Sequence, residues 1–193
     1  MRHLALDYLL AAQSASLTQA EQLLESADNL TDRLAALRWI AQYANGAQRE
    51  QTLANFYDRW KRESLVVNQW FTVQATRPDI SCVESVRGLL NPAAFDWRTP
   101  NQLRALVGAF AAANPLAFHR VDGAGYQLLG DVITRIQSSN PQIAARMLAP
   151  LTRWRRYAVG QDAMKAELER IAGIDPLPKD VFEVVNRSLA EPD

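Results

Sequence analysis

Arg104 and Arg146 are the residues whose positions most clearly suggest binding chemistry. Each follows a proline that comes directly after a helix-capping residue, in "TPNQLRALVGAF" (99–110) and "NPQIAARMLAP" (140–150). Because Thr-Pro and Asn-Pro favour a helix start, both arginines are predicted in the second turn of a helix, nearer its positive end. An anion held by the forked guanidinium and nearby N–H groups would be favoured there. The spacing predicts anion capture, with an ordinary ion pair to a neighbouring carboxylate as the alternative.

The sequence carries no recognisable machinery for breaking bonds. Its two histidines, His3 and His119, cannot form a His-Glu-x-x-His zinc site, and no Gly-x-Ser-x-Gly motif occurs. His119 is expected to have a structural role at a helix end. Glu167 and Glu169 are predicted on different sides of a solvated helix, and Cys82 as a small packed residue. No catalytic residue, metal ligand or cofactor is predicted in this chain.

The charge balance argues against several classes of protein. The 193 residues include 21 basic and 21 acidic side chains, whereas binding to nucleic acid or an anionic membrane needs a concentrated positive field. The cluster "RWRRY" (153–157) leaves a nucleic-acid patch open, but we favour Trp154 as a core anchor flanked by arginines. No apolar run approaches the ~20 residues that cross a bilayer, and the N-terminal segment is interpreted as a first helix. The single cysteine suits a cytoplasmic protein.

Helical periodicity runs through almost the whole chain. It predicts helices over 30–44 and 47–63, and over the valine-rich segment 64–76, whose apolar residues follow three-and-four spacing. Further starts are predicted at four capping-residue and proline pairs, at 91–92, 99–100, 114–115 and 140–141. About ten short helices without strands favour an all-α fold, a superhelical array of antiparallel helix pairs like armadillo or HEAT repeats. One helical-repeat domain over residues 1–193 is expected.

Five stretches of the chain resemble a known family when taken in order. They are "NLTDRLAAL" (29–37), "FYDRWKRESLVVNQWFTVQAT" (56–76), "VRGLLNPAAF" (86–95), "PNQLRALVGAFAAANPLAFHRVDGAGYQLL" (100–129) and "NPQIAARMLAPLTRWRRY" (140–157). Together they resemble the C-terminal domain of bacterial aminopeptidases N, the alanyl aminopeptidases of the zinc-dependent gluzincin class. The resemblance implies that this chain is one domain of a longer enzyme that releases N-terminal residues from peptides.

The resemblance also implies that the chemistry lies outside this chain. In the family, zinc is bound by His-Glu-x-x-His with a distant glutamate, and the free amine of the substrate by a Gly-Ala-Met-Glu-Asn segment; neither motif occurs here. The family role is an all-α cap that closes over the catalytic domain, lines an internal cavity and controls the entry of peptides. The implied partners are the chain's own catalytic domain and peptide substrates, with zinc only in the full-length enzyme and no nucleic acid or membrane.

The resemblance gives the two arginines a specific role. Arg104 and Arg146 fall at positions similar to the family's cavity-lining arginines, with Asn101 and Gln142 close by on the same helix starts. They are expected to attract and orient the C-terminal carboxylate of a peptide whose amino end is at the zinc. The alternative is a free-standing helical-repeat scaffold that binds another protein on a concave face.

Overall fold

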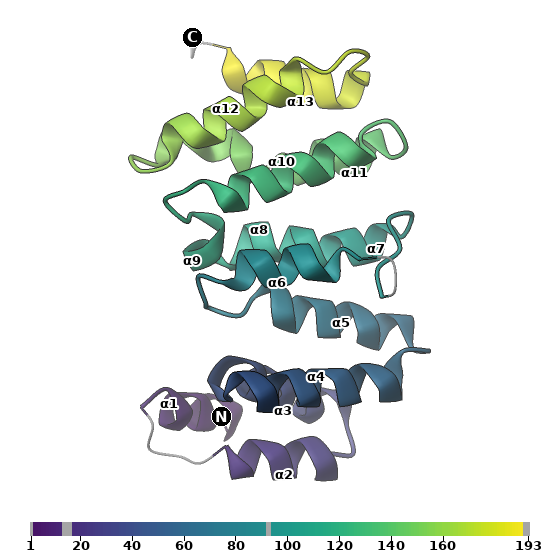
Figure 1. Ribbon diagram of the computed structural model, residues 1–193, viewed down its shortest axis with the longest axis vertical. Coiled ribbons are helices and arrows are strands. Elements are labelled where there is room, and N and C mark those ends of the chain that lie inside the picture. The colour runs from purple at the N-terminus through teal and green to yellow at the C-terminus, as the bar shows by residue number, and fades with distance from the viewer. Residues whose placement is uncertain (1, 13–16, 92–93, 191–193) are drawn as a thin grey trace. The chain divides into compact units, whose positions relative to one another are not determined.

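The computed structural model describes residues 2–12, 17–91 and 94–190, and its regular elements are all helical (Figure 1). The all-α prediction is therefore confirmed, with no strand among the described residues. The chain divides into two compact units, the first ending at Arg77 and the second beginning at Pro78. The assignment of a single domain to residues 1–193 stays a prediction.

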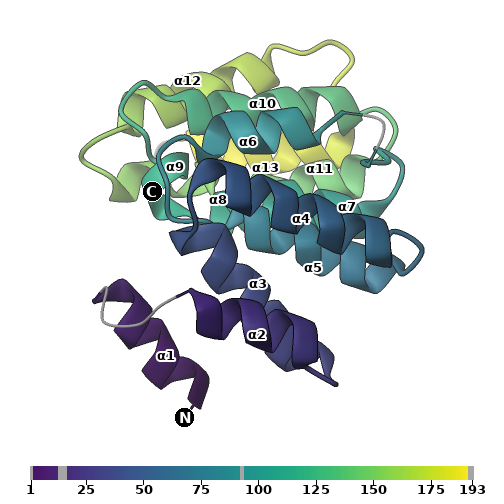
Figure 2. The same cartoon turned by 60° about the horizontal axis from the view of Figure 1, so that its bottom comes forward.

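The described part of the first unit consists of α1 (Arg2–Ala11), α2 (Thr18–Ser26), α3 (Leu30–Tyr43), α4 (Gly46–Trp60) and α5 (Ser64–Ala75). Helix α2 lies along α3 (Figure 2), and Trp39 and Ile40 of α3 are only 3% and 1% exposed. The valine-rich segment forms α5, as its period predicted, and packs against α3 and α4 with Phe71 fully buried. The three-and-four spacing therefore identified a buried helix in a composition that favours strands.

The described part of the second unit consists of α6 (Cys82–Leu89), α7 (Pro100–Leu103), the π-helical turn η1 (Arg104–Gly108), α8 (Ala109–Ala113), α9 (Pro115–Phe118), α10 (Ala124–Ile136), α11 (Pro141–Met147), the 3-10 helix η2 (Leu151–Arg156), α12 (Gln161–Ala172) and α13 (Lys179–Leu189). Helix α10 packs on α12, and α11 packs on α13, so that one helix pair lies on the next (Figure 1). This stacking is the arrangement expected of armadillo or HEAT repeats.

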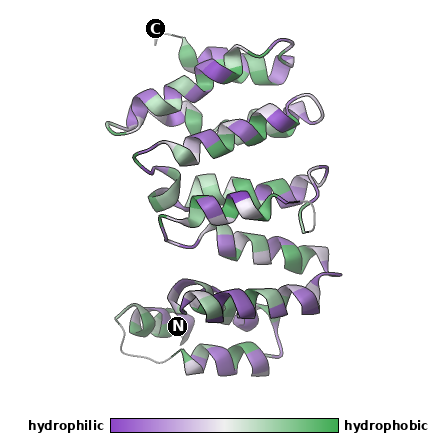
Figure 3. Cartoon of the chain, viewed as in Figure 1, coloured by the Kyte–Doolittle hydropathy of each residue, from purple (hydrophilic) through white to green (hydrophobic). Residues whose placement is uncertain are grey.

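Each helix of the stack has a mixed surface. Figure 3 shows hydrophobic and hydrophilic residues interspersed along the helices. Leu129 and Ile133 of α10, Leu168 of α12 and Val185 of α13 are fully buried. Burial of such side chains contributes about 1.5–3 kcal/mol each, and it explains why helices this short are stable in the stack.

Asparagine and proline start two of the helices that were predicted from them. The side-chain oxygens of Asn114 and Asn140 accept hydrogen bonds from the N–H groups of Ala117 and Ile143, at 3.2 and 3.3 Å. The following prolines occupy the first helical position, where no N–H is needed. Thr99 precedes α7 without a side-chain cap bond. The start predicted at 91–92 includes residue 92, which lies outside the described residues.

Two glycines with positive φ make the turns that precede long helices. Gly123 has φ of 73° immediately before α10, which confirms the chain reversal predicted there. Gly160 has φ of 86° before α12, and a Cβ at this position would overlap the Tyr126 hydroxyl. Any side chain at Gly160 would therefore push Tyr126 away from the turn.

Candidate functional site

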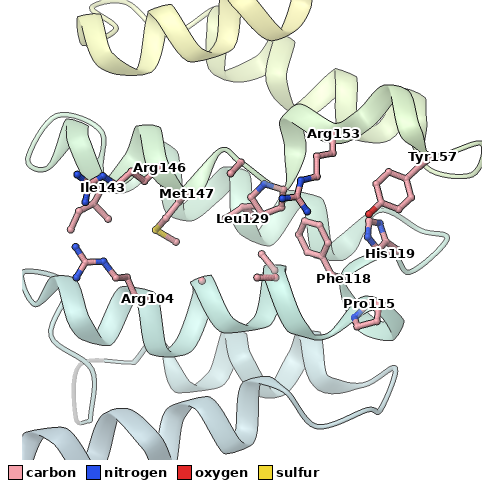
Figure 4. Close-up of a pocket in the computed structure, with 15 residues that line it drawn as sticks. Arg104, Pro115, Phe118, His119, Leu129, Ile143, Arg146, Met147, Arg153 and Tyr157 are labelled. Atoms are coloured by element: carbon pink, nitrogen blue, oxygen red, sulfur yellow. The ribbon is translucent and has the colours of Figure 1, made fainter.

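A pocket within the second unit contains both of the arginines that the sequence singled out. It has a volume of about 370 Å³ and lies between the run α7–η1–α8 on one side and α11 with the start of η2 on the other (Figure 4). Its lining residues are Arg104, Gly108, Ala111, Ala112, Pro115, Phe118, His119, Leu129, Ile143, Arg146, Met147, Ala149, Pro150, Arg153 and Tyr157. We call this site the arginine pocket, and Arg104, Arg146 and Arg153 the pocket arginines.

Small side chains create the hollow on the α7–η1–α8 side. Gly108, Ala111 and Ala112 follow Arg104 at the spacings of one helix face, and none of them extends beyond a Cβ. The helix widens into a π turn from Arg104 to Gly108, a feature that is common at functional sites. A larger side chain at any of these positions would fill space that the pocket leaves open.

Arg104 lies where the sequence placed it, in the second turn after Pro100. Its Nη1 donates a hydrogen bond to the Oδ1 of Asn101 at 2.9 Å, and its side chain is exposed. Asn101 itself does not line the pocket. The amide of Asn101 therefore orients the guanidinium, while the remaining N–H groups of Arg104 stay available to a ligand.

Arg146 also lines the pocket, but one part of its prediction is wrong. Helix α11 ends at Met147, so Arg146 lies in its last turn and not near its positive end. A cation is favoured at that end of a helix, and the helix dipole therefore gives no reason to expect an anion beside Arg146. An anion is expected beside Arg146 for another reason: Arg104 and Arg146 lie at the same end of the pocket, on opposite walls, and their two positive charges are close to one another (Figure 4).

Gln142, like Asn101, is a predicted residue that does not line the pocket. It is exposed in the first turn of α11 and is not among the lining residues. Its spacing of four residues from Arg146 puts both on one side of the helix. A ligand that extends beyond the pocket along α11 would meet Gln142.

Arg153 is a third pocket arginine that sequence reasoning did not select. Its neighbours behave as predicted: Trp154 is 8% exposed, and the Arg155 guanidinium lies 4.1 Å from the centre of its ring. Arg155 also donates to the Ser188 and Ala190 carbonyl oxygens, at 2.5 and 2.6 Å. Arg153 instead reaches into the pocket (Figure 4). Within the "RWRRY" cluster, Arg155 therefore makes structural contacts, whereas Arg153 is available to a ligand.

The charged side chains that line the pocket are all positive among the described residues. No lining residue is acidic, and none of the pocket arginines forms an ion pair with a carboxylate in the described part of the chain. Two other arginines of the unit show the contrast, since Arg120 contacts Glu84 and Asp122, and Arg170 contacts Glu167 and Asp131. The pocket therefore presents positive charge that an anionic ligand can neutralise.

His119 closes the other end of the pocket. A hydrogen bond of 2.8 Å joins its Nδ1 to the Tyr126 hydroxyl, and the centre of its ring lies 4.2 Å from that of Tyr157. Burial lowers the pKa of His119 below its usual value, because the charged form is desolvated. These contacts are consistent with the predicted structural role, and they hold the His119 ring between Tyr126 and Tyr157.

Glu167 corrects a smaller prediction. Its side chain is only 12% exposed and accepts hydrogen bonds from the Arg170 Nε and Nη2 at 2.9 and 2.6 Å. It is therefore not on a solvated face, as the sequence pattern suggested, but forms an ion pair at the contact of α12 with α10. Gly130 of α10 allows this close approach, because a Cβ there would overlap the Glu167 carboxylate.

The described residues offer a binding site and no metal centre. No group of three or more His, Cys, Asp or Glu side chains among residues 2–12, 17–91 and 94–190 could hold a metal ion. None of the helices in the same ranges combines the length and hydropathy that a membrane span requires. An apolar hollow with three available guanidinium groups can bind and orient an anionic molecule.

Comparison with known proteins places the chain among aminopeptidase sequences. The family model described as "Domain of unknown function (DUF3458_C) ARM repeats" matches residues 1–190. The chain is 42% identical to aminopeptidase N of Haemophilus influenzae over 190 residues, covering 98% of this chain and 22% of that protein. It is also 42% identical to aminopeptidase N of Escherichia coli over 165 residues, covering 85% of this chain and 19% of that protein.

The structural comparison agrees. The crystal structure of Legionella pneumophila aminopeptidase A in complex with aspartic acid matches with a TM-score of 0.83 and 30% identity, covering 90% of this chain and 20% of that one. The chain thus spans about a fifth of the length of the relatives it matches.

Proposed function

The chain belongs to the DUF3458_C family of ARM-repeat domains, and on this basis we propose that it is the noncatalytic C-terminal domain of an aminopeptidase that releases N-terminal residues from peptides. Its small share of each relative's length supports a role beside a separate catalytic region. In this proposal residues 1–193 act as one domain, their partner is the catalytic domain of the same polypeptide, and the whole is cytoplasmic. The domain caps the catalytic region, lines an internal cavity and controls the access of peptides.

The catalytic metal of the proposed enzyme is zinc, held outside this chain. The sequence contains no His-Glu-x-x-His motif, and the described residues do not fit a metal site. Zinc would polarise the scissile carbonyl and activate water in the catalytic domain. This chain's own residues contribute binding and orientation.

The observation that carries the proposal is the convergence of the pocket arginines, which form no ion pair with a carboxylate of the described residues. Arg104 and Arg146 lie at one end of an apolar hollow, from two different helices (Figure 4). We assign them to the C-terminal carboxylate of a peptide, which a pair of guanidinium groups can hold with several charge-assisted hydrogen bonds. Asn101 orients Arg104, and Gln142 would contact the peptide main chain beyond the pocket.

The test uses the full-length polypeptide that carries this chain. Replacing Arg146 by alanine is expected to raise KM about tenfold for a peptide of four or more residues and to leave KM for an alanine amide reporter nearly unchanged. The matched control is Arg156→Ala, which removes an exposed arginine that does not line the pocket. Equal effects of Arg146→Ala on both substrates would contradict the assignment.

A mixing experiment addresses the noncatalytic role. The 193-residue chain alone should show no turnover of an alanine amide reporter with added zinc, and it should alter peptide turnover when mixed with the matching catalytic fragment. Zinc-dependent turnover by this chain alone would contradict the proposal. Failure to associate with the catalytic fragment would favour a free-standing scaffold.

A further inference from the structure

The interior of the arginine pocket is apolar beyond the arginine pair. Phe118, Leu129, Ile143 and Met147 line it and are 1%, 0%, 7% and 7% exposed (Figure 4). Their buried positions keep this wall in one arrangement, because the core behind it is close-packed. A carboxylate bound at Arg104 and Arg146 would therefore have apolar surface beside it.

The volume of the pocket accommodates more than a carboxylate. About 370 Å³ falls within the range of small-molecule sites, roughly 300–1,000 Å³. A carboxylate alone would occupy one end of it, and the space over Gly108 and Ala111 would remain for an attached group. Apart from Arg153, the side chains that line the pocket between the arginine pair and the His119 end are apolar, so an apolar attached group is favoured there.

The charge of the pocket determines which groups are rejected. Arg153 lies across the pocket from the Arg104 and Arg146 end and directs its guanidinium toward Phe118 (Figure 4). A lysine or arginine side chain entering the hollow would be desolvated beside Arg153, and no described residue that lines the pocket is a carboxylate that could pair with it. The pocket therefore combines attraction for one charge with exclusion of the other.

We infer that the arginine pocket is a specificity site for the C-terminal residue of a peptide: it accepts a large apolar side chain next to the carboxylate and excludes a cationic one. The inference rests on the proposed function and names the substrate class of the same site. In it, Arg104 and Arg146 bind the carboxylate and Arg153 sets the selectivity against lysine and arginine. The apolar wall that includes Ala111, Ile143 and Met147 contacts the side chain.

The first experiment measures binding by calorimetry to the complete polypeptide that contains this chain. The ligands are N-acetylated tripeptides, whose blocked amino end prevents aminopeptidase cleavage, with Phe, Ala or Lys at the C-terminus. The Phe peptide is expected to bind about tenfold more tightly than the Ala peptide and more tightly still than the Lys peptide. Equal affinity for Phe, Ala and Lys would overturn the inference.

Two further ligands separate this inference from the proposed function. The C-terminal amide of the Phe peptide lacks the carboxylate, and its equal affinity would contradict the proposed carboxylate site itself. If the acid binds better than the amide while Phe and Ala peptides bind alike, the proposed function stands and the apolar specificity fails. The second ligand, 3-phenylpropanoate, carries the same apolar carboxylate without a peptide. An affinity equal to that of the Phe peptide would overturn the assignment to peptides.

Two variants test the residues that carry the selectivity. Gly108→Leu is expected to remove the preference for Phe, because its Cβ meets only ordinary contacts and the rest of the side chain enters the pocket. Gly88→Leu is the matched control, since this exposed glycine of α6 has open space around it. A preference for Phe that survives in a folded Gly108→Leu protein would contradict the inference.

The second variant, Arg153→Glu, changes the charge of the pocket and leaves its apolar wall unchanged. Arg153→Glu is expected to raise affinity for the Lys peptide at least about tenfold while the Phe peptide remains bound, because the cation then meets a carboxylate. Arg156→Glu makes the same charge change on the same 3-10 helix outside the pocket. Equal gains for the Lys peptide in both variants would mean that Arg153 has no specific role. Thermal melting of each variant establishes that it is folded.

Discussion

The second unit uses arginine in two different ways. Arg120 and Arg170 each contact two carboxylates and join segments that are far apart in the sequence, since Arg120 reaches Glu84 and Arg170 reaches Asp131. The pocket arginines contact no carboxylate among the described residues and surround an apolar hollow. The same side chain therefore stabilises the fold where its charge is matched and is available to a ligand where it is not. This difference predicts that substitution of the pocket arginines changes ligand affinity, whereas substitution of Arg120 or Arg170 changes the stability of the fold.

The largest effect is expected in binding at the pocket. Replacing Arg104 and Arg146 together by alanine should weaken binding of a peptide with a free C-terminal carboxylate by about 30-fold. Both arginines are exposed, so each hydrogen bond to the carboxylate is taken at about 1 kcal/mol. Calorimetry measures the affinity, and urea unfolding of the same variant should show a change within about 0.5 kcal/mol, because no carboxylate loses a partner. A large loss of stability without loss of binding would mean that Arg104 and Arg146 stabilise the fold and do not bind the ligand.

The next effect is on stability at a paired arginine. Arg170→Ala is expected to lower the free energy of unfolding by about 1.5 kcal/mol, because it removes the cation that pairs with the largely buried Glu167 carboxylate. The value is reduced from that of a fully buried pair, since the Arg170 side chain is 42% exposed. Urea denaturation measures it. Adding Glu167→Gln should recover part of the loss, and no recovery would mean that packing, not charge, is responsible.

A smaller effect with a distinct pH dependence is expected at Arg120. Its guanidinium lowers the pKa of Glu84 and of Asp122 below their usual values. A lowered folded-state pKa gives stability that is present above the unfolded value of about 4 and is lost as the pH falls through the folded value. Arg120→Ala should therefore lower Tm at pH 7, by less than Arg170→Ala, and the difference in Tm should shrink as the pH falls below about 4. A Tm difference that does not shrink in acid would exclude this electrostatic origin.

The smallest effect is expected from His119, which would add a fourth cation to the pocket if protonated. Burial lowers its pKa, so the unfolded chain binds the proton more readily than the folded one. Stability should therefore be full above the unfolded value of about 6.5 and decrease as the pH falls from there toward the folded value. Urea unfolding at pH 7.5 and 5.5 measures the decrease. His119→Phe should reduce it, and an unchanged pH dependence in that variant would assign the effect to other groups.

Much of this fold could be predicted from local signals in the sequence. Asn114 and Asn140 mark helix starts because a cap and a proline act within one turn, and the structure shows both cap hydrogen bonds. The helix over Ser64–Ala75 was predicted from apolar spacing alone. These features depend on residues three or four positions apart, which a sequence shows directly.

The candidate site depends on features that such signals do not contain. Arg146 lies in a last turn because α11 is only seven residues long. Asn140 and Pro141 mark the start of that helix, but its end was not predicted. Arg153 lines the pocket from a 3-10 helix that follows α11, and the place of this segment beside the α7–η1–α8 run depends on tertiary packing. The π turn from Arg104 to Gly108 likewise has no marker in the sequence. The convergence of three arginines is set by how successive helix pairs pack.

The pocket walls come from successive helix pairs, and this has a consequence for how the unit opens. In stacked repeats each pair is held mainly by its neighbours, so local unfolding can begin at the junction between two of them. A ligand that touches both Arg104 and Arg146 binds only when this junction is closed. At a concentration 100 times its Kd, it would protect the junction by about 2.7 kcal/mol. An occupied pocket would therefore join two neighbouring cooperative units into one, visible as slower hydrogen exchange in α8 and α11.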